Sequence, residues 1–237
     1  MRQPTQTTRV EAIRALSPHV REIVLAPPPE PVRFRPGQWI SLHLPVGEKP
    51  PLVRAYTLSA PEDPSGRLVL CLDRVSSGLG SEYLFRVRPG DELTFVGPLG
   101  NFVLPEPLTQ DVVFAARYTG IMPIRCMLLD LQRRPLPVDV TLVYGGPSRE
   151  ELIYHEGLAA YAAREPRFHY HPTLLRPSPG WCGPVGEELH LLHPLLGGRP
   201  PDYLPMVCGI KEFARPVRTF FQEQGFERRQ VKVETYD

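Results

Sequence analysis

Residues Arg54-Ala55-Tyr56-Thr57-Leu58-Ser59 form the stretch of sequence that decides the fold. Side chains alternate across a strand, so Arg54, Tyr56 and Leu58 share one face. Along that face a guanidinium group and a phenol ring lie about 7 Å apart. The guanidinium group suits a diphosphate, and the ring suits the flat face of a cofactor. Taken alone, the six residues are better explained by an ordinary strand with an exposed arginine and a half-buried tyrosine.

Three further motifs accompany this stretch in the first half of the chain. They are Phe34-Arg35-Pro36-Gly37-Gln38-Trp39, Gly78-Leu79-Gly80-Ser81-Glu82-Tyr83-Leu84 and Gly97-Pro98-Leu99-Gly100-Asn101-Phe102. In this order and spacing, the four motifs resemble the flavin-binding domain of the ferredoxin–NADP reductase-like superfamily. The resemblance spans most of residues 34–102. It implies an N-terminal antiparallel β-barrel domain that binds FAD, at residues 1–107.

The glycine-rich motif also carries a physical argument of its own. Gly78 and Gly80 allow the backbone to approach a phosphate, and Ser81 is expected to cap a short helix over residues 81–86. In isolation, a plain glycine turn with a helix cap explains the motif better. Beside Arg54, the loop is expected to hold the same diphosphate from a second side, which favours FAD over FMN.

The resemblance implies roles for individual residues of this first half. Tyr56 stacks on the flavin ring, and Thr57 has a catalytic role as a hydrogen-bond donor near flavin N5. The segment Leu72-Asp73-Arg74 lies along the flavin nucleotide, mostly through backbone groups. The flavin-binding residues expected on this basis are Arg54, Ala55, Tyr56, Thr57, Leu72, Asp73, Arg74, Gly78, Leu79, Gly80 and Ser81.

Composition describes an ordinary globular protein and excludes several classes of partner. Of the 237 residues 42% are hydrophobic and 22% are charged, and the net charge of +1 gives no sign of a nucleic-acid or anionic-membrane partner. A polar N-terminus and the lack of any apolar stretch near 18 residues predict a soluble, cytoplasmic protein without membrane insertion. The cysteines form no C-x-x-C pair, and His169-x-His171 has no apparent third ligand, so no metal site is expected.

The pattern of hydrophobic residues changes near residues 105–110. Before it, short alternating strands are expected at 8–14, 20–25, 38–44, 54–59, 67–74 and 92–96, as in a small antiparallel barrel. After it, strands are expected at 111–116, 138–144, 168–174, 203–209 and 230–236, with helices at 124–132, 150–164 and 212–224. Alternating strands and helices predict a Rossmann-like α/β domain with a parallel sheet at residues 108–237.

The second half resembles the pyridine-nucleotide domain of the same superfamily, with departures. The turn that in relatives reads Ala-Gly-Gly-Thr-Gly-Ile-Ala-Pro is here Ala116-Arg117-Tyr118-Thr119-Gly120-Ile121-Met122-Pro123. Two large side chains replace glycines, and Tyr118 is a candidate to stack near the flavin. Pro147 stands where relatives carry an arginine, for which Arg149 is a weak substitute. The resemblance implies nucleotide-binding roles for Tyr118, Thr119, Gly120, Cys208 and Gly209, with Cys208 facing the reacting nicotinamide carbon; a buried structural Cys208 is the alternative.

Two functions follow from these motifs. The first is an FAD-dependent oxidoreductase that takes a hydride from NAD(P)H and passes electrons to a separate acceptor protein or small molecule, since no ferredoxin-type cysteine spacing or haem motif is present. The second is an FAD-binding electron-transfer subunit whose pyridine-nucleotide site is non-productive, because Arg117, Tyr118 and Pro147 have altered it. The persistence of Thr-Gly-Ile-x-Pro and of Cys208-Gly209 favours the first, by a narrow margin.

Overall fold

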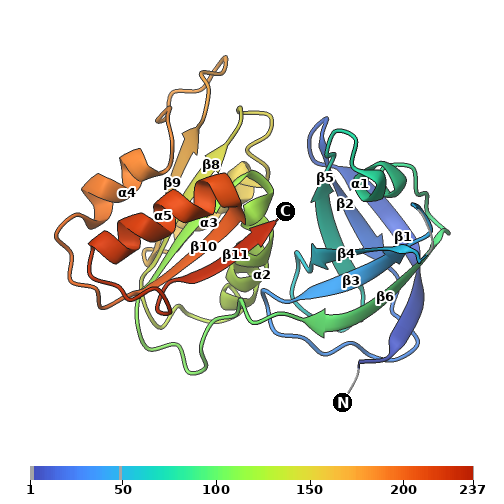
Figure 1. Cartoon of the computed structure of the whole chain (residues 1–237). Coiled ribbons are helices and arrows are strands. Elements are labelled where there is room, and N and C mark those ends of the chain that lie inside the picture. The colour runs from blue at the N-terminus through green and yellow to red at the C-terminus, as the bar shows by residue number, and fades with distance from the viewer. Residues whose placement is uncertain (1–2, 48–49, 237) are drawn as a thin grey trace. The chain divides into compact units, whose positions relative to one another are not determined.

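The structure, a computed structural model, describes residues 3–47 and 50–236. Its contacts divide the chain into two compact units, one made of Met1–Leu104 with Arg125–Arg133 and the other of Pro105–Ile124 with Arg134–Asp237. The first unit holds an antiparallel sheet and the second a parallel sheet (Figure 1). The predicted fold class is therefore confirmed.

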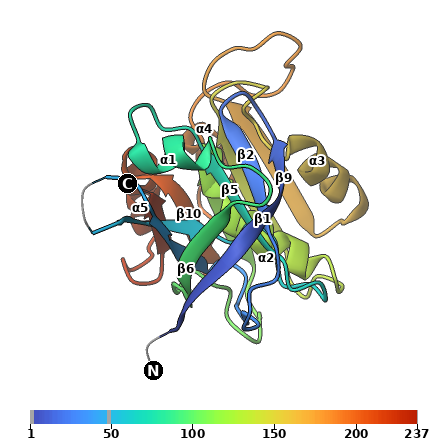
Figure 2. The ribbon, with the colours of Figure 1, turned by 90° about the vertical axis from the view of Figure 1, so that its right-hand side faces the viewer.

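The first unit is a six-stranded antiparallel barrel. Its strands are β1 (Thr5–Ala15), β2 (Val20–Leu25), β3 (Trp39–Leu44), β4 (Leu52–Thr57), β5 (Leu68–Asp73) and β6 (Glu92–Leu99). They pair in the order β4-β3-β6-β1-β2-β5, and an antiparallel bridge between Leu58 and Leu70 joins the two outer strands. The short helix α1 (Leu79–Leu84) lies beside the end of β5 (Figure 2).

Alternation of side chains explains why these segments form a barrel. In β3, Ile40, Leu42 and Leu44 are fully buried, whereas the residues between them are only partly buried. Gly37, from the Pro-Gly-Gln motif, has φ 102°, and a Cβ there would overlap the carbonyl oxygen of Phe102. Only glycine fits this position, so two of the sequence motifs meet in space.

The second unit is a five-stranded parallel sheet in the order β11-β10-β7-β8-β9. The strands are β7 (Val112–Arg117), β8 (Val140–Gly146), β9 (Phe168–Leu174), β10 (Leu204–Ile210) and β11 (Lys232–Tyr236). Helices α4 (Leu189–Leu196) and α5 (Lys211–Glu223) cover one face (Figure 1), where their apolar residues share a core with Val113, Ala115 and Val207. The near-continuous apolar strands are those of a sheet covered on both faces.

Several helix boundaries differ from the prediction. Helix α3 runs from His155 to Arg164 and not from Glu150, because Tyr154 adopts a left-handed conformation with φ 60° just before it. Helix α2 (Ile121–Leu131) follows a 3₁₀ turn, η1 (Tyr118–Gly120), and so begins three residues earlier than expected. Proline at position 123 is compatible with this start, since the first turn of a helix needs no N–H there.

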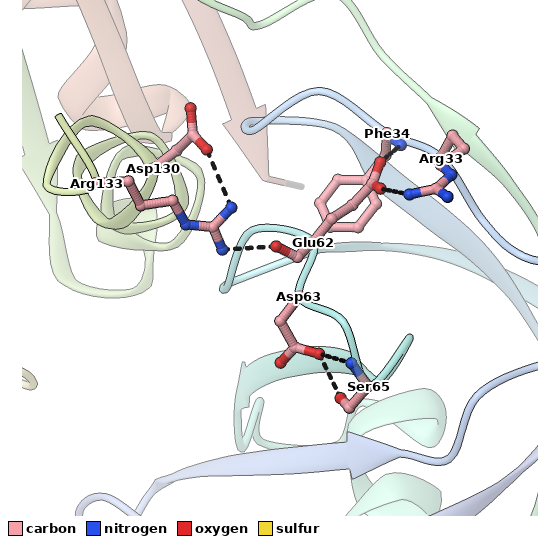
Figure 3. Close-up of polar contacts among 7 residues, drawn as sticks. All are labelled: Arg33, Phe34, Glu62, Asp63, Ser65, Asp130 and Arg133. Atoms are coloured by element: carbon pink, nitrogen blue, oxygen red, sulfur yellow. Dashed lines mark hydrogen bonds and ion pairs between the residues drawn. The ribbon is translucent and has the colours of Figure 1, made fainter.

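The later part of α2 is anchored to the barrel unit. The Arg125 guanidinium donates to the backbone carbonyl of Ser59 at 2.6 Å and lies 3.8 Å from the buried Glu22 carboxylate. Arg133, just after the helix, donates to the carbonyl of Glu62 at 2.6 Å (Figure 3). Cys126 belongs to the barrel core. These contacts explain why residues 125–133 cluster with the first unit.

Replacing Arg125 by Met is expected to lower the free energy of unfolding by about 2–3 kcal/mol, because it strands a buried carboxylate with one cationic partner fewer. The side chains of Arg125 and Glu22 are only 18% and 6% exposed. Arg133→Met is the matched control. This variant should lower the free energy of unfolding by less than about 1 kcal/mol, because Arg133 is half exposed. Urea unfolding measures the free energy of unfolding of both variants. Equal decreases would contradict the conclusion that Arg125 stabilises the buried Glu22 carboxylate.

Candidate functional site

The first group of predicted site residues lies on β4. Arg54 and Ala55 are exposed, Tyr56 is half-buried and Thr57 is buried. Burial raises the pKa of Tyr56 to about 12, so its hydroxyl stays protonated at neutral pH. Arg54 donates only to the neighbouring Val53 carbonyl, at 2.9 Å, and within residues 3–47 and 50–236 it forms no ion pair. An exposed arginine without a carboxylate partner is suited to bind an anion.

The glycine loop brings α1 against this strand. A Cβ on Gly80 would lie 3.4 Å from the Tyr56 hydroxyl oxygen and 3.1 Å from Leu44 Cδ1. A side chain at position 80 would therefore crowd β3 and β4. The close approach places Gly80 beside the Tyr56 hydroxyl group.

Ser81 does not cap the helix, and the prediction on this point is wrong. Helix α1 starts two residues earlier, at Leu79, with Gly78 as its N-cap. The Ser81 hydroxyl instead accepts from the backbone N–H of Val75 at 3.1 Å and faces the carbonyls of Val75 and Gly78. The Ser81 side chain thus stabilises the loop itself. The groups of the loop that are suited to bind a phosphate are therefore its backbone N–H groups.

The segment Leu72-Asp73-Arg74 leads from β5 into this loop. Leu72 is buried, and the Arg74 guanidinium forms a paired contact with Glu82 of α1, at 2.9 and 3.1 Å. Arg74 therefore holds α1 in place. This donor set comprises one guanidinium without an ion pair among the described residues, one phenol ring and a tight glycine loop, and it fits the diphosphate and planar ring of FAD.

The second group of predicted residues meets at the carboxyl ends of β7 and β10. A Cβ on Gly120 would overlap the carbonyl oxygen of Cys208, so η1 rests directly on the end of β10. Thr119 lies in this turn, and Gly209 follows Cys208 on the strand. Ligands of parallel α/β sheets bind at the carboxyl ends of the strands. The arrangement brings Thr119, Gly120, Cys208 and Gly209 together.

The two large residues that replace glycines point to different partners. The Arg117 guanidinium donates to both carboxylate oxygens of the buried Glu188, with Nε at 3.0 and 3.1 Å. The Tyr118 hydroxyl donates to Glu151 at 2.9 Å, and Tyr118 has a left-handed φ of 50°. Sequence reasoning missed both acids, which lie 71 and 33 residues away from their partners. The predicted stacking of Tyr118 near the flavin stays a prediction.

Cys208 lies beside two groups of β11. Burial raises the pKa of its thiol, against a hydrogen bond from Tyr236, so the sulfur is not ionised near neutral pH. Glu234 pairs with Cys208 in the strand register, and burial raises the pKa of its carboxyl to about 7. Sequence reasoning missed Glu234, because β11 reads KVETY and a charged residue is not unusual in such a polar strand.

The other candidates carry less weight. Arg149 is exposed and donates to the carbonyl of Gly180 at 3.1 Å, while Pro147 ends the β8 turn without a polar side chain. Among the described residues no group of histidine, cysteine, aspartate or glutamate side chains is arranged to hold a metal ion. In the same part of the chain, no helix has the length and apolar character to cross a membrane.

The raised pKa of Glu234 predicts a pH dependence of stability. Its pKa is about 7 in the folded protein against 4.5 in the unfolded chain, so the folded state holds the extra proton between these values. This carboxyl therefore makes the protein lose stability as pH rises from 4.5 towards 7 and above. We expect the melting temperature of Glu234→Gln to fall less between pH 5 and pH 8 than that of the unchanged protein. Parallel profiles for the two proteins would contradict the burial of this carboxyl.

Comparison with known proteins gives a family model for each half of the chain. The family model described as an oxidoreductase FAD-binding domain matches residues 7–104, and that of an oxidoreductase NAD-binding domain matches residues 118–219. The ferredoxin–NADP reductase B of Sorangium cellulosum (strain So ce56) is 36% identical, over 97% of this chain and 96% of that protein. The reductase component of phenol 2-monooxygenase from Pseudomonas sp. (strain CF600) is 28% identical, over 92% of this chain and 62% of that protein.

Solved structures share the fold. The cytochrome P450 reductase GcoB of Amycolatopsis has a TM-score of 0.85 at 24% identity, covering 98% of this chain and 69% of its own. A ferredoxin NADP+ reductase from Neisseria gonorrhoeae with bound FAD and NADP has a TM-score of 0.80 at 21% identity, covering 98% of each chain. Because the Sorangium relative matches nearly end to end and both domain models are present, this chain belongs to the ferredoxin–NADP reductase-like family of oxidoreductases, which use FAD and a pyridine nucleotide.

Proposed function

We propose that the protein takes a hydride from NADPH or NADH and passes the electrons to a separate acceptor protein, with residues 1–107 as the FAD-binding domain and residues 108–237 as the NAD(P)-binding domain. The observation that carries this proposal is the presence of both sites in one chain: the Arg54–Tyr56 face with its glycine loop, and the Gly120–Cys208 contact. The name of the Sorangium relative supports a ferredoxin as the acceptor. Reductase components of oxygenases among the relatives also support a protein acceptor.

When bound, FAD would supply the hydride acceptor and the single-electron donor of the reaction. The chain's own residues supply binding and orientation. Arg54 and the backbone of the Gly78–Ser81 loop would hold the diphosphate, and Tyr56 would cover the flavin ring. Thr57 is the proposed hydrogen-bond donor near flavin N5, and Cys208 the proposed neighbour of the nicotinamide. Because burial raises the pKa of Cys208, we assign its thiol a packing role and no proton transfer.

The alternative of an FAD-binding electron-transfer subunit with a non-productive nucleotide site receives no specific support. It was based on Arg117, Tyr118 and Pro147. Two of these side chains are held by carboxylates of their own unit.

Anaerobic addition of NADPH, and separately of NADH, to the yellow protein tests the proposal. We expect rapid bleaching of the visible flavin absorbance with at least one nucleotide, and recovery of the colour when an oxidised ferredoxin is added. The control is dithionite, which reduces the flavin regardless of the nucleotide site. Bleaching by dithionite alone would support the electron-transfer subunit instead.

Removing the unpaired guanidinium tests the FAD site separately. Arg54→Ala is expected to weaken FAD binding about tenfold or more, because a charge-assisted contact to a phosphate contributes roughly 1.5–3 kcal/mol. Titration of apoprotein with FAD, followed by flavin fluorescence, measures the dissociation constant. Arg33→Ala, at another exposed arginine, is the matched control and should leave it unchanged. Equal affinity of both variants would exclude Arg54 as a diphosphate ligand.

A further inference from the structure

Arg117 lies on the face of the sheet that α4 and α5 cover. Val113 and Ala115, two and four residues earlier on β7, belong to the core shared with these helices. Because side chains alternate along a strand, Arg117 continues the same row. Val207 of β10 is also in that core, so the next residue, Cys208, faces the opposite side of the sheet. Arg117 and Cys208 therefore point to different faces.

The guanidinium group of Arg117 is fixed by several contacts. Its Nε donates to both oxygens of Glu188, and Nη2 makes a further short bond to the same carboxylate. The side chains are 14% and 0% exposed. The guanidinium carbon also lies 4.9 Å from the centre of the Phe213 ring of α5. A planar group held on two sides and stacked on a ring has little freedom to swing out.

Two glycines on the neighbouring strands provide the space for this pair. Gly145 of β8 is the register partner of Arg117, and a Cβ there would overlap Oε1 of Glu188. Gly209 of β10 lies on the other side, and a Cβ there would lie 2.7 Å from Phe213 Cδ1 and 3.5 Å from Arg117 Cβ. The bulk added at position 117 is thus accommodated by missing side chains on both flanks.

We propose that Arg117 is a positioning residue of the pyridine-nucleotide site, an inference that rests on the proposed function. Its pair with Glu188 fixes the last residue of β7 and the start of α4. The turn Tyr118–Gly120 begins directly after that fixed residue. The side chain lies on the face away from Cys208 and does not obstruct a nicotinamide there.

The substitution Arg117→Gly distinguishes positioning from obstruction. It installs the glycine that relatives carry, but leaves the Glu188 carboxylate buried without its partner. We expect NADP+ or NAD+ to bind about fivefold more weakly, with flavin reduction slowed at saturating NADPH or NADH and FAD affinity unchanged. Calorimetric titration of the FAD-loaded protein and anaerobic stopped-flow absorbance provide the measurements. A gain in affinity of about tenfold would overturn the proposal, since it would mean that Arg117 had blocked the nucleotide.

A second variant covers the case in which Arg117→Gly fails to fold. Arg117→Ala with Glu188→Leu removes both charges and keeps an apolar group in the niche, which is tolerated where a buried ion pair is replaced as a whole. The proposal predicts no gain in nucleotide affinity over the unchanged protein. A gain in nucleotide affinity in this double variant would overturn the proposal. For Arg117→Gly, a lower melting temperature with unchanged nucleotide affinity would also overturn it, because the pair would then be purely structural. If the unchanged protein binds neither NADP+ nor NAD+, the proposed function itself fails.

Discussion

Close approach of backbone segments is the constraint on which both halves of this protein depend. In the barrel, the turn at Gly37 rests on the carbonyl of Phe102 only because position 37 has no side chain. In the parallel sheet, the turn after β7 rests on the carbonyl of Cys208 only because position 120 has none. The second contact brings the start of α2 to the end of β10, where backbone N–H groups are available to an anionic ligand. A methyl group at position 37 or 120 would overlap a backbone carbonyl, so the segments in contact would have to move apart.

In the second half, a large side chain at position 117 is accommodated beside these close contacts. Arg117 occupies a position where the motif that this turn resembles has glycine, yet its side chain is paired with Glu188 inside the unit. A buried ion pair contributes little net stability compared with an apolar core, but losing one partner is costly. The pair therefore links two segments that are far apart in sequence, because either side chain alone would be a buried charge without its partner. Gly145 and Gly209, on the flanking strands, leave the space that this pair and Phe213 occupy.

Much of the fold could be predicted from local patterns. The alternation of Ile40, Leu42 and Leu44 defined a barrel strand, and the apolar run of β7 defined a buried parallel strand. The contacts of Arg117 could not be predicted, because its partner lies 71 residues later and no periodicity links them. The helix cap was misassigned because a serine after glycines fits two local patterns. The later part of α2 belongs to the barrel unit because Arg125 contacts the carbonyl of Ser59, and this tertiary contact has no sequence signature.

The proposed function requires that a nicotinamide deliver its hydride to the flavin. Single-turnover reduction of the anaerobic protein by NADPH or NADH with both hydrogens at nicotinamide C4 replaced by deuterium tests this requirement most directly. The account predicts that the flavin is reduced more slowly by the deuterated nucleotide, because the transferred hydride breaks that bond. Reduction at the same rate with either isotope, in a protein whose nucleotide binding is fast, would contradict direct transfer.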